Sequence, residues 1–209
     1  MLFHTTHENE SNGRSIIQPE LDILINRPPN NMVAMREYFL TSERLSFSVW
    51  REDDLAYAQK LWGNPEVTKY LISGGRMSPE DVRRRLEQEI GTFRALGIQY
   101  WPVFLKGTGE FVGCCGLRPH GDDTHVLEIG VHLVRAHWGK GIATEACRAV
   151  THHAFEELEV SCLFAGHNPK NSASARMIRN LGFTYVADEY YPSTGLMHPS
   201  YTMVKKCQE

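Results

Sequence analysis

Apolar and polar residues follow regular patterns from about residue 38 onward, and these patterns predict strands and helices in alternation. Short apolar or alternating runs between turn residues are typical of strands. They cover residues 45–49, 98–105, 110–117, 126–134, 160–166, 183–187 and 200–205. Apolar residues spaced three and four apart are typical of helices. They cover residues 51–61, 79–96, 144–158 and 171–181, with a short helix or turn at 66–71.

Turn and capping residues support this order of elements. Ser78-Pro79-Glu80-Asp81 predicts a helix start, with serine as N-cap, proline at the first helical position and acids in the first turn. Lys106-Gly107-Thr108-Gly109 predicts a hairpin between two strands. Three consecutive strands then precede a strand–helix–strand unit. The sequence therefore predicts an α/β or α+β fold of about 170 residues, a mixed sheet with helices on both faces.

The first 37 residues differ from the rest of the chain. They contain Pro28-Pro29 and Asn30-Asn31 and show little periodicity. We therefore expect residues 1–37 to form a partly ordered N-terminal extension, and residues 38–209 to form the main folded domain. An alternative is that the extension acts as an arm between two copies in a homodimer, or as a lid.

Composition and charge narrow the class of protein. The formal net charge of −3 gives no general attraction to nucleic acid or to anionic membranes. No apolar run is long enough to cross a bilayer, and the N-terminus lacks the regions of a signal peptide. The five cysteines include no C-x-x-C pair, which favours reduced thiols and a cytoplasmic location. Because the ten histidines are scattered, no metal site is predicted.

The most informative segment is residues 135–146, Arg-Ala-His-Trp-Gly-Lys-Gly-Ile-Ala-Thr-Glu-Ala, between a predicted strand and a predicted helix. A glycine-containing turn at this place leaves several backbone N–H groups pointing one way. The helix N-terminus adds about half a positive charge in the same direction. The segment therefore predicts a site for a polyanion, most simply a pyrophosphate.

Two other phosphate motifs do not fit. A Walker A loop needs glycine at 134 and serine or threonine after Lys140, whereas the chain has Val134 and Gly141. A dinucleotide fingerprint needs glycine or alanine at 144, whereas the chain has Thr144. A glycine-rich helix start without a ligand remains an alternative. Trp138 argues against it, because a large apolar residue in a tight turn needs something to pack on.

The full pattern of the segment, R-x-x-W-G-K-G-x-A-x-E-A, resembles the acetyl-CoA loop of the GNAT N-acetyltransferases, in particular the RimJ/RimL-like branch. Four other segments are similar to that branch. Residues 62–71 resemble W-x-x-P-x-V-x-x-Y-[LM], and residues 109–113 resemble a GE-x-[IV]-G hairpin. Residues 127–130 resemble an EIGY strand, and residues 168–183 resemble N-x-x-N-x-x-S followed by K-x-G-F. Five matches in the right order span roughly residues 42 to 205.

The resemblance implies a central mixed, mostly antiparallel sheet with helices on both faces, and acetyl-CoA as cosubstrate. Backbone N–H groups of the glycine loop would hold the pyrophosphate, and two parallel strands would part to admit the pantetheine. The N–H of Ile129 or a neighbour would polarise the acetyl carbonyl. The implied cofactor-binding residues are Ile129, Arg135, Trp138, Gly139, Lys140, Gly141, Ile142, Ala143, Asn171 and Ser174.

The resemblance also implies catalytic residues. Glu128 would take the proton of the acceptor amine, directly or through water. The alternative is a solvent-facing residue at the sheet edge. Ser174 would protonate the departing CoA thiolate, and Asn171 would bind the pantetheine or fix its loop. For both, helix capping is the alternative. Val131 stands where the branch has tyrosine, so the substrate pocket need not have the branch's shape.

The acceptor site is less well defined by the sequence. Trp62, Tyr70, Leu71 and Trp101 are candidate substrate-binding residues, with core packing as the alternative for all four and the favoured interpretation for Trp101. The predicted reaction is a direct attack of a primary amine on acetyl-CoA in a ternary complex. The acceptor is a protein N-terminus or a small-molecule amine, and neither nucleic acid nor membrane is an expected partner.

Three alternatives stay open at this point. The chain could be a non-catalytic acyl-CoA-binding regulatory module, or, with less support, a nucleotide-binding protein. The triplet Arg83-Arg84-Arg85 is interpreted as a solvated helix face, with steering of an acidic peptide or an RNA-bound partner as the alternative.

Overall fold

The computed structural model describes residues 36–121, 123 and 125–205. The predicted extension lies outside these residues apart from Arg36 and Glu37, so its role stays a prediction. Arg36 belongs with the folded part, because its guanidinium forms an ion pair with Asp54 and donates a hydrogen bond to the Val49 carbonyl (3.2 Å).

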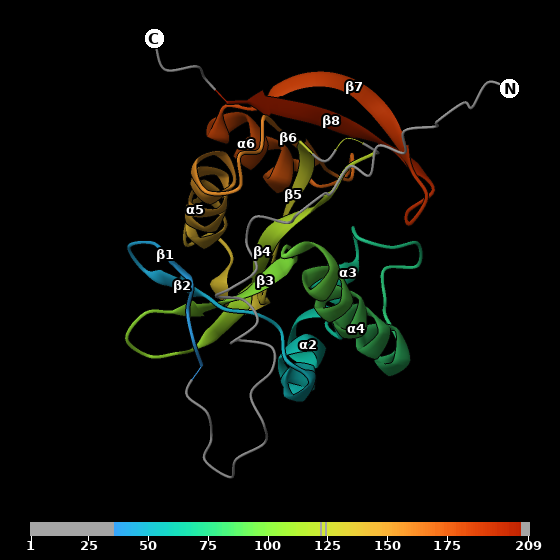
Figure 1. Ribbon diagram of the computed structural model, residues 1–209. Helices are drawn as coiled ribbons and strands as arrows, with labels where there is room; N and C mark the ends of the chain where they lie inside the picture. The colour runs from blue at the N-terminus through green and yellow to red at the C-terminus, as the bar shows by residue number, and fades with distance from the viewer. Residues whose placement is uncertain (1–35, 122, 124, 206–209) are drawn as a thin grey trace, which may run out of the picture. The chain divides into compact units, whose positions relative to one another are not determined.

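The described strands form one sheet in the order β1-β2-β3-β4-β5-β6-β8-β7 (Figure 1). Neighbouring strands are antiparallel except β5 and β6, which are parallel. The predicted mixed, mostly antiparallel sheet is therefore confirmed. The strands are β1 (Leu40–Thr41), β2 (Leu45–Phe47), β3 (Tyr100–Leu105), β4 (Phe111–Pro119), β5 (Val126–Leu133), β6 (Cys162–Gly166), β7 (Thr184–Tyr191) and β8 (Leu196–Val204).

Helices cover both faces of this sheet, as predicted (Figure 1). One face carries α2 (Leu55–Trp62) and α4 (Pro79–Leu96), with the short α3 (Pro65–Thr68) beside them. The other face carries α5 (Ile142–Glu156) and α6 (Ser172–Leu181). Two 3₁₀ turns, η1 (Glu52–Asp54) and η2 (Arg135–His137), precede α2 and α5.

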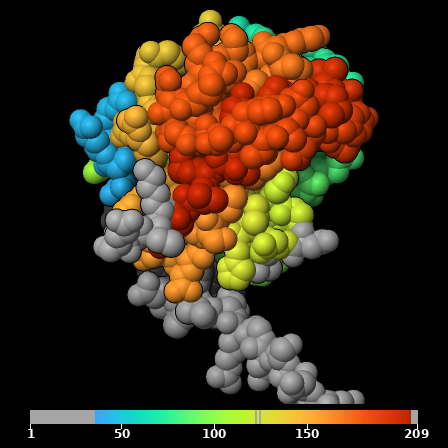
Figure 2. Space-filling view, turned by 90° about the horizontal axis from the view of Figure 1, so that it is seen from above, coloured from blue at the N-terminus to red at the C-terminus, as the bar shows by residue number. Residues whose placement is uncertain are grey.

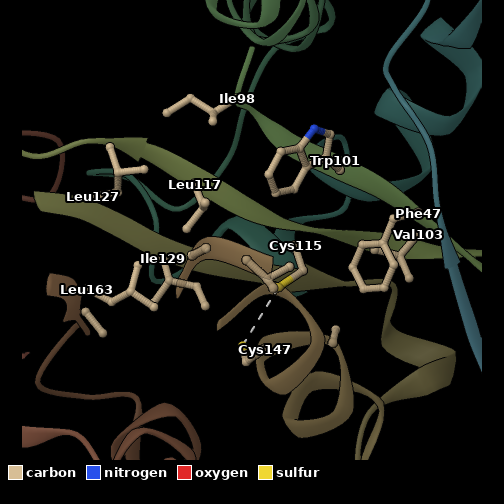
Figure 3. Close-up of a cluster of buried hydrophobic side chains, with 14 of the residues drawn as sticks. Phe47, Ile98, Trp101, Val103, Cys115, Leu117, Leu127, Ile129, Cys147 and Leu163 are labelled. Atoms are coloured by element: carbon tan, nitrogen blue, oxygen red, sulfur yellow. Dashed lines mark hydrogen bonds between the residues drawn. The ribbon is translucent and has the colours of Figure 1, made fainter. Parts of the chain in front are cut away.

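The sheet separates two apolar cores. Figure 3 shows the core under α5, where Cys115 of β4 faces Cys147 of α5 with 3.9 Å between the sulfur atoms. Cys114, the preceding residue, lies in the other core, against α2 and α4. This alternation confirms that the two adjacent cysteines face opposite sides of their strand. Among the described cysteines, Cys114, Cys115, Cys147 and Cys162 are free thiols.

The ends of some strands and helices differ from the prediction where the pattern of apolar and polar residues is weak. Strand β1 has two residues, which is too short for a periodic pattern. Strands β7 and β8 run longer than predicted, since every side chain of β7 is exposed and no alternation of burial marks its length. Figure 2 shows this hairpin spread over one face of the molecule. Helix α5 begins two residues earlier than predicted, directly after Gly141.

The N-terminal cap of α4 gives a test of stability. Ser78 accepts a hydrogen bond from the Asp81 N–H (3.1 Å), and Asp81 accepts one from the Ser78 N–H (2.9 Å). We expect Ser78→Ala to lower the free energy of unfolding by about 1 kcal/mol, because the cap of the first turn is lost. Urea denaturation followed by circular dichroism measures this. Ser172→Ala, an exposed serine in the first turn of α6, is the matched control. Equal stability of wild type and Ser78→Ala would contradict the prediction.

Candidate functional site

The parallel pair β5–β6 is short, and the two strands part in the middle of the sheet. Their register covers Val126↔Cys162, Leu127↔Leu163 and Glu128↔Phe164. Beyond Glu128, β5 continues along β4 to Leu133, while β6 continues along β8 to Gly166. The second half of β5 therefore has an edge that β6 does not cover.

The hydrogen-bond alternation of β5 determines which backbone groups face this edge. The Leu117 N–H of β4 bonds to the Gln99 carbonyl on the β3 side, and Leu117 is the register partner of Ile129. In an antiparallel ladder Ile129 and Val131 therefore turn their N–H and C=O groups away from β4. The parallel pair Glu128↔Phe164 uses the Ile129 N–H, so the groups at the uncovered edge are the Ile129 carbonyl and the N–H and carbonyl of Val131. An extended ligand with amide groups can pair with such an edge as a strand does.

The glycine loop follows β5 directly. Gly139 and Gly141 have φ angles of 73° and 76°, in the left-handed region that favours glycine. Gly139, Lys140 and Gly141 are exposed, and Gly141 is the N-cap of α5. Within the described part of the chain, the backbone N–H groups from Gly139 to Ala143 have no acceptor. The loop and the first turn of α5 therefore present free donors to solvent, as a helix N-terminus does.

Contacts from the β1–β2 hairpin hold this loop in place. Glu145, in the first turn of α5, accepts hydrogen bonds from the Ser42 hydroxyl (2.6 Å), the Arg44 N–H (2.7 Å) and the Arg44 Nε (2.6 Å). Arg44 Nη1 also donates to the Lys140 carbonyl (3.1 Å). Sequence reasoning missed this role. Glu145 is part of the loop motif, but its partners lie about a hundred residues earlier, where no local pattern marks them.

The aromatic residue of the loop is anchored as well. Trp138 donates from its indole N–H to the Leu133 carbonyl (2.8 Å). Arg135 lies over the Trp138 ring, 4.8 Å from its centroid, and its Nε is 3.4 Å from Glu66 of α3. Arg135 thus has protein partners, whereas Lys140 is exposed and forms no ion pair among the described residues.

On the α2/α4 face of β5, Tyr100 crosses the strand at Gly130. A Cβ atom at Gly130 would lie 2.2 Å from the Tyr100 hydroxyl oxygen and 2.3 Å from its ring carbon, so only glycine leaves room for this ring. The Tyr100 hydroxyl donates to Glu128 Oε1 (3.0 Å). Glu128 is half-buried on an inner strand of the sheet, so the alternative of a solvent-facing edge residue is wrong.

Tyr100 is itself fixed by a buried charge cluster. Glu89 of α4 is fully buried, accepts from the Tyr100 N–H (2.9 Å) and from Arg85 Nε (2.8 Å), and pairs with Arg118. The Arg118 guanidinium lies 4.3 Å from the centroid of the Tyr100 ring, and Arg118 is the register partner of Glu128. Burial, and then the nearby Glu128 charge, raise the pKa of Tyr100 well above its usual value, so the phenol stays a donor.

The interpretation of Arg83-Arg84-Arg85 as a solvated helix face is wrong for Arg85. Arg83 and Arg84 are exposed, as predicted. The Arg85 side chain is only 15% exposed, because it points inward to Glu89 one helical turn later.

Two tryptophans expected to be substrate-binding are buried instead, so that prediction is wrong for them. Trp62 is fully buried and donates to His132 Nδ1 (3.1 Å). Trp101 is 1% exposed and packs against Phe39 and His153, which confirms core packing. Burial lowers the pKa of His132 well below its usual value, and the charges of Arg85 and Arg118 act in the same direction.

Asn171 is the N-cap of α6, and its side chain accepts the Ser174 N–H (3.2 Å). The capping alternative is therefore confirmed for the Asn171 carbonyl oxygen. Ser174 is half-buried, and its hydroxyl has no hydrogen-bond partner among the described residues. This hydroxyl is thus available to a ligand.

A cavity of about 500 Å³ lies beside these residues. It is lined by the α3–α4 connection, including Tyr70, by the loop after β6 and by the β7–β8 hairpin. The Ser73 N–H bonds to the Ser193 carbonyl (2.6 Å), and Asn168 donates to the Tyr70 carbonyl (3.4 Å), so the three segments are joined. Leu71 does not line the cavity and packs against the α2/α4 core.

Residues 44–184 match the model of a protein family described as an acetyltransferase (GNAT) domain. The chain belongs to the GNAT acetyltransferase family. It is an acetyl-CoA-dependent N-acetyltransferase. Membership of this family argues against the alternative of a non-catalytic acyl-CoA-binding module. The described residues hold no group of three or more metal-ligating side chains and no helix that is long and apolar enough to cross a membrane.

Relatives and solved structures agree with this membership. The uncharacterized protein YkkB of Bacillus subtilis is 34% identical over 128 residues, which are 60% of this chain and 72% of that protein. The uncharacterized N-acetyltransferase p20 of Bacillus licheniformis is 28% identical, over 69% of this chain and 81% of its own length. RimL, a ribosomal L7/L12 alpha-N-protein acetyltransferase, has the same fold, with a TM-score of 0.70 at 18% identity, covering 86% of this chain and 99% of RimL.

The contacts of Glu145 give a test at acid pH. Burial acts to raise the pKa of Glu145, but the hydrogen bonds from Ser42 and Arg44 outweigh it, and the pKa is lowered from 4.5. A carboxyl whose pKa is lower in the folded state stabilises the fold above its unfolded pKa and loses this effect as the pH falls through the folded value. We therefore expect Glu145→Gln to be less stable than wild type at pH 7, and the difference to shrink below pH 4.5.

Urea denaturation at a series of pH values measures this difference. Glu87→Gln, on the exposed side of α4, is the matched control. A stability difference between wild type and Glu145→Gln that does not change with pH would contradict the ion pair and its hydrogen bonds as the cause.

Proposed function

We propose that the glycine loop binds the pyrophosphate of acetyl-CoA and that the uncovered edge of β5 binds its pantetheine. The free N–H groups from Gly139 to Ala143, the Ile129 carbonyl and the backbone groups of Val131 support this proposal. The two left-handed glycines keep side chains out of the ligand's path. The Lys140 side chain adds a positive charge, and the Asn171 side-chain N–H groups and the Ser174 hydroxyl are further contacts.

We propose Glu128 as the base for the acceptor amine. As the amine nitrogen bonds to the acetyl carbon, it loses a proton to Glu128, directly or through a water molecule. The N–H of Val131, a near neighbour of Ile129, lies on the uncovered edge and would stabilise charge on the acetyl oxygen. When the carbon–sulfur bond breaks, the thiolate takes a proton from the Ser174 hydroxyl, which takes one from water in the same step. Glu128 then releases its proton to solvent, so both residues return to their starting state.

The single observation that carries this assignment is the hydrogen bond from Tyr100 to Glu128. It comes from a ring that Gly130 admits and that Glu89 and Arg118 hold in place. A base works best when its proton-accepting oxygen is held in position, because a fixed geometry lowers the entropic cost of the reaction. Tyr100 is therefore a positioning residue for Glu128.

The acceptor is a primary amine, either at a protein N-terminus or in a small molecule, and it would bind in the cavity beside Tyr70. A cytoplasmic location, a homodimer and a partly ordered extension at residues 1–37 stay predictions.

Cofactor binding is tested by thermal shift. At a hundred times its Kd, acetyl-CoA should stabilise the wild type by about 2.7 kcal/mol. Gly141→Glu should lose this effect, because it places a carboxylate in the anion site and a side chain at φ 76°. Gly107→Glu is the matched control, since Gly107 has a φ angle of 84° in the β3–β4 hairpin. Equal stabilisation of the wild type and Gly141→Glu would exclude the loop as the cofactor site.

Catalysis is tested by the rate of CoA release with an accepted amine. Glu128→Gln should lower kcat by roughly 10²- to 10⁴-fold, the usual contribution of a general base. Tyr100→Phe should lower kcat by roughly tenfold with an unchanged KM for acetyl-CoA, because a hydrogen bond to the charged carboxylate is lost.

A second tyrosine separates this effect from a general effect of removing a hydroxyl. Tyr185→Phe, an exposed tyrosine bonded to Asp188, is the matched control and should keep the wild-type kcat. A wild-type kcat in Tyr100→Phe would exclude the positioning role.

A further inference from the structure

The lining of the 500 Å³ cavity has an unbalanced charge. Three cationic side chains, Lys69, Arg76 and Lys170, contribute to it, and no aspartate or glutamate does so. All three are exposed, and none forms an ion pair within the described part of the chain. The chain as a whole carries a formal net charge of −3. The cavity is therefore a positive site on a protein of opposite net charge.

The walls of the cavity are built from segments that are held together. Gly74 and Gly75 adopt φ angles of 78° and 66°, which turn the α3–α4 connection back on itself. Thr68 of α3 donates to the Gly75 carbonyl (3.0 Å) and so closes this turn. The bonds from Ser73 to Ser193 and from Asn168 to Tyr70 then join the turn to the other two segments. The cations thus stand on a fixed frame around one space.

The cavity also lies next to the proposed reaction centre. Lys170 directly precedes Asn171, the N-cap of the helix that carries Ser174. Glu66, one residue from the lining residue Pro65, contacts Arg135 of the cofactor loop. The lining is therefore adjacent in the chain to the cap of the Ser174 helix and to a residue that contacts the glycine loop.

We propose that the acceptor is a primary amine whose own molecule carries a carboxylate or phosphate close to the amine. This inference rests on the proposed function and deepens it. The anionic group pairs with the cavity cations, which fixes the orientation of the acceptor. The same positive charges disfavour an ammonium ion nearby, so the bound amine loses its proton more readily and becomes nucleophilic. Polyamines and lysine-rich peptides are repelled by the same charges.

A panel of matched amines tests the proposal with the full-length chain. 2-Aminoethyl phosphate, 4-aminobutan-1-ol and butane-1,4-diamine have chains of similar length and differ in charge. The dipeptide amides Asp-Phe, Asn-Phe and Lys-Phe give the same comparison at a peptide N-terminus. We expect kcat/KM, measured by release of the CoA thiol, to be highest for the anionic member of at least one series, and that series identifies the source of the amine.

Charge variants link this preference to the cavity. Arg76→Gln combined with Lys170→Gln should lower kcat/KM roughly tenfold for the anionic amine, the effect of losing a charge-assisted contact. The neutral amine of the same series should change less than twofold. Added salt should lower kcat/KM for the anionic amine only, because it screens exposed charges. Arg176→Gln, an exposed arginine on α6 outside the lining, is the matched control.

Two results separate the failure of this inference from that of the proposed function. In the first, the neutral or cationic amine is acetylated faster than the anionic one in both series, and Glu128→Gln still loses activity. This result overturns only the inference that the acceptor is anionic. An equal loss for all amines in the double variant also overturns it, since the cations would then act on folding or cofactor binding. Absence of acetylation with every amine, and no stabilisation by acetyl-CoA, overturns both.

Discussion

The limited pairing between β5 and β6 is the constraint on which the rest of the site depends. If the two strands paired along their full length, the Ile129 carbonyl and the backbone groups of Val131 would be satisfied within the sheet. Because pairing ends at Glu128, the sheet keeps an inner edge at the place where one strand leads into the glycine loop. The proposed base, the proposed oxyanion donor and the helix N-terminus all follow this edge within about fifteen residues.

The site has an apolar support on one side of the sheet and a charged support on the other. Under α5, apolar side chains around Cys115 and Leu117 support β5, and the contact drawn among them joins the Cys115 and Cys147 thiols (Figure 3). Under α4, two arginines share the buried Glu89, and Glu128 supplies the second negative charge. A buried cluster of this kind is sensitive to the loss of any one member, since an unpaired charge is left behind.

Most of the fold could be predicted from the sequence because its signals are local. The cap at Ser78 and the glycine at 97 mark the first and last residues of α4. The adjacent cysteines of β4 face opposite cores, as the two-residue period of a strand requires. The loop that we propose as the cofactor site is marked in the sequence by its glycines. What the sequence did not reveal depends on distant partners. Arg44 and Glu145 are far apart in the chain, Trp62 and Trp101 have side chains that suit a pocket and a core equally well, and Arg85 differs from Arg83 only in the face it occupies.

Because the Tyr100 ring passes close over Gly130, residues 100 and 130 can be substituted only together, although they lie on different strands. A residue larger than glycine at 130 needs a smaller or displaced residue at 100, because the ring occupies the space of the missing Cβ. Among relatives that keep a glutamate at the position of Glu128, an aromatic residue at the position of Tyr100 should therefore accompany glycine at the position of Gly130. A substitution at the position of Tyr100 is thereby limited by the residue at the position of Gly130, and the reverse holds as well. Substitutions at these two positions should therefore be correlated among relatives.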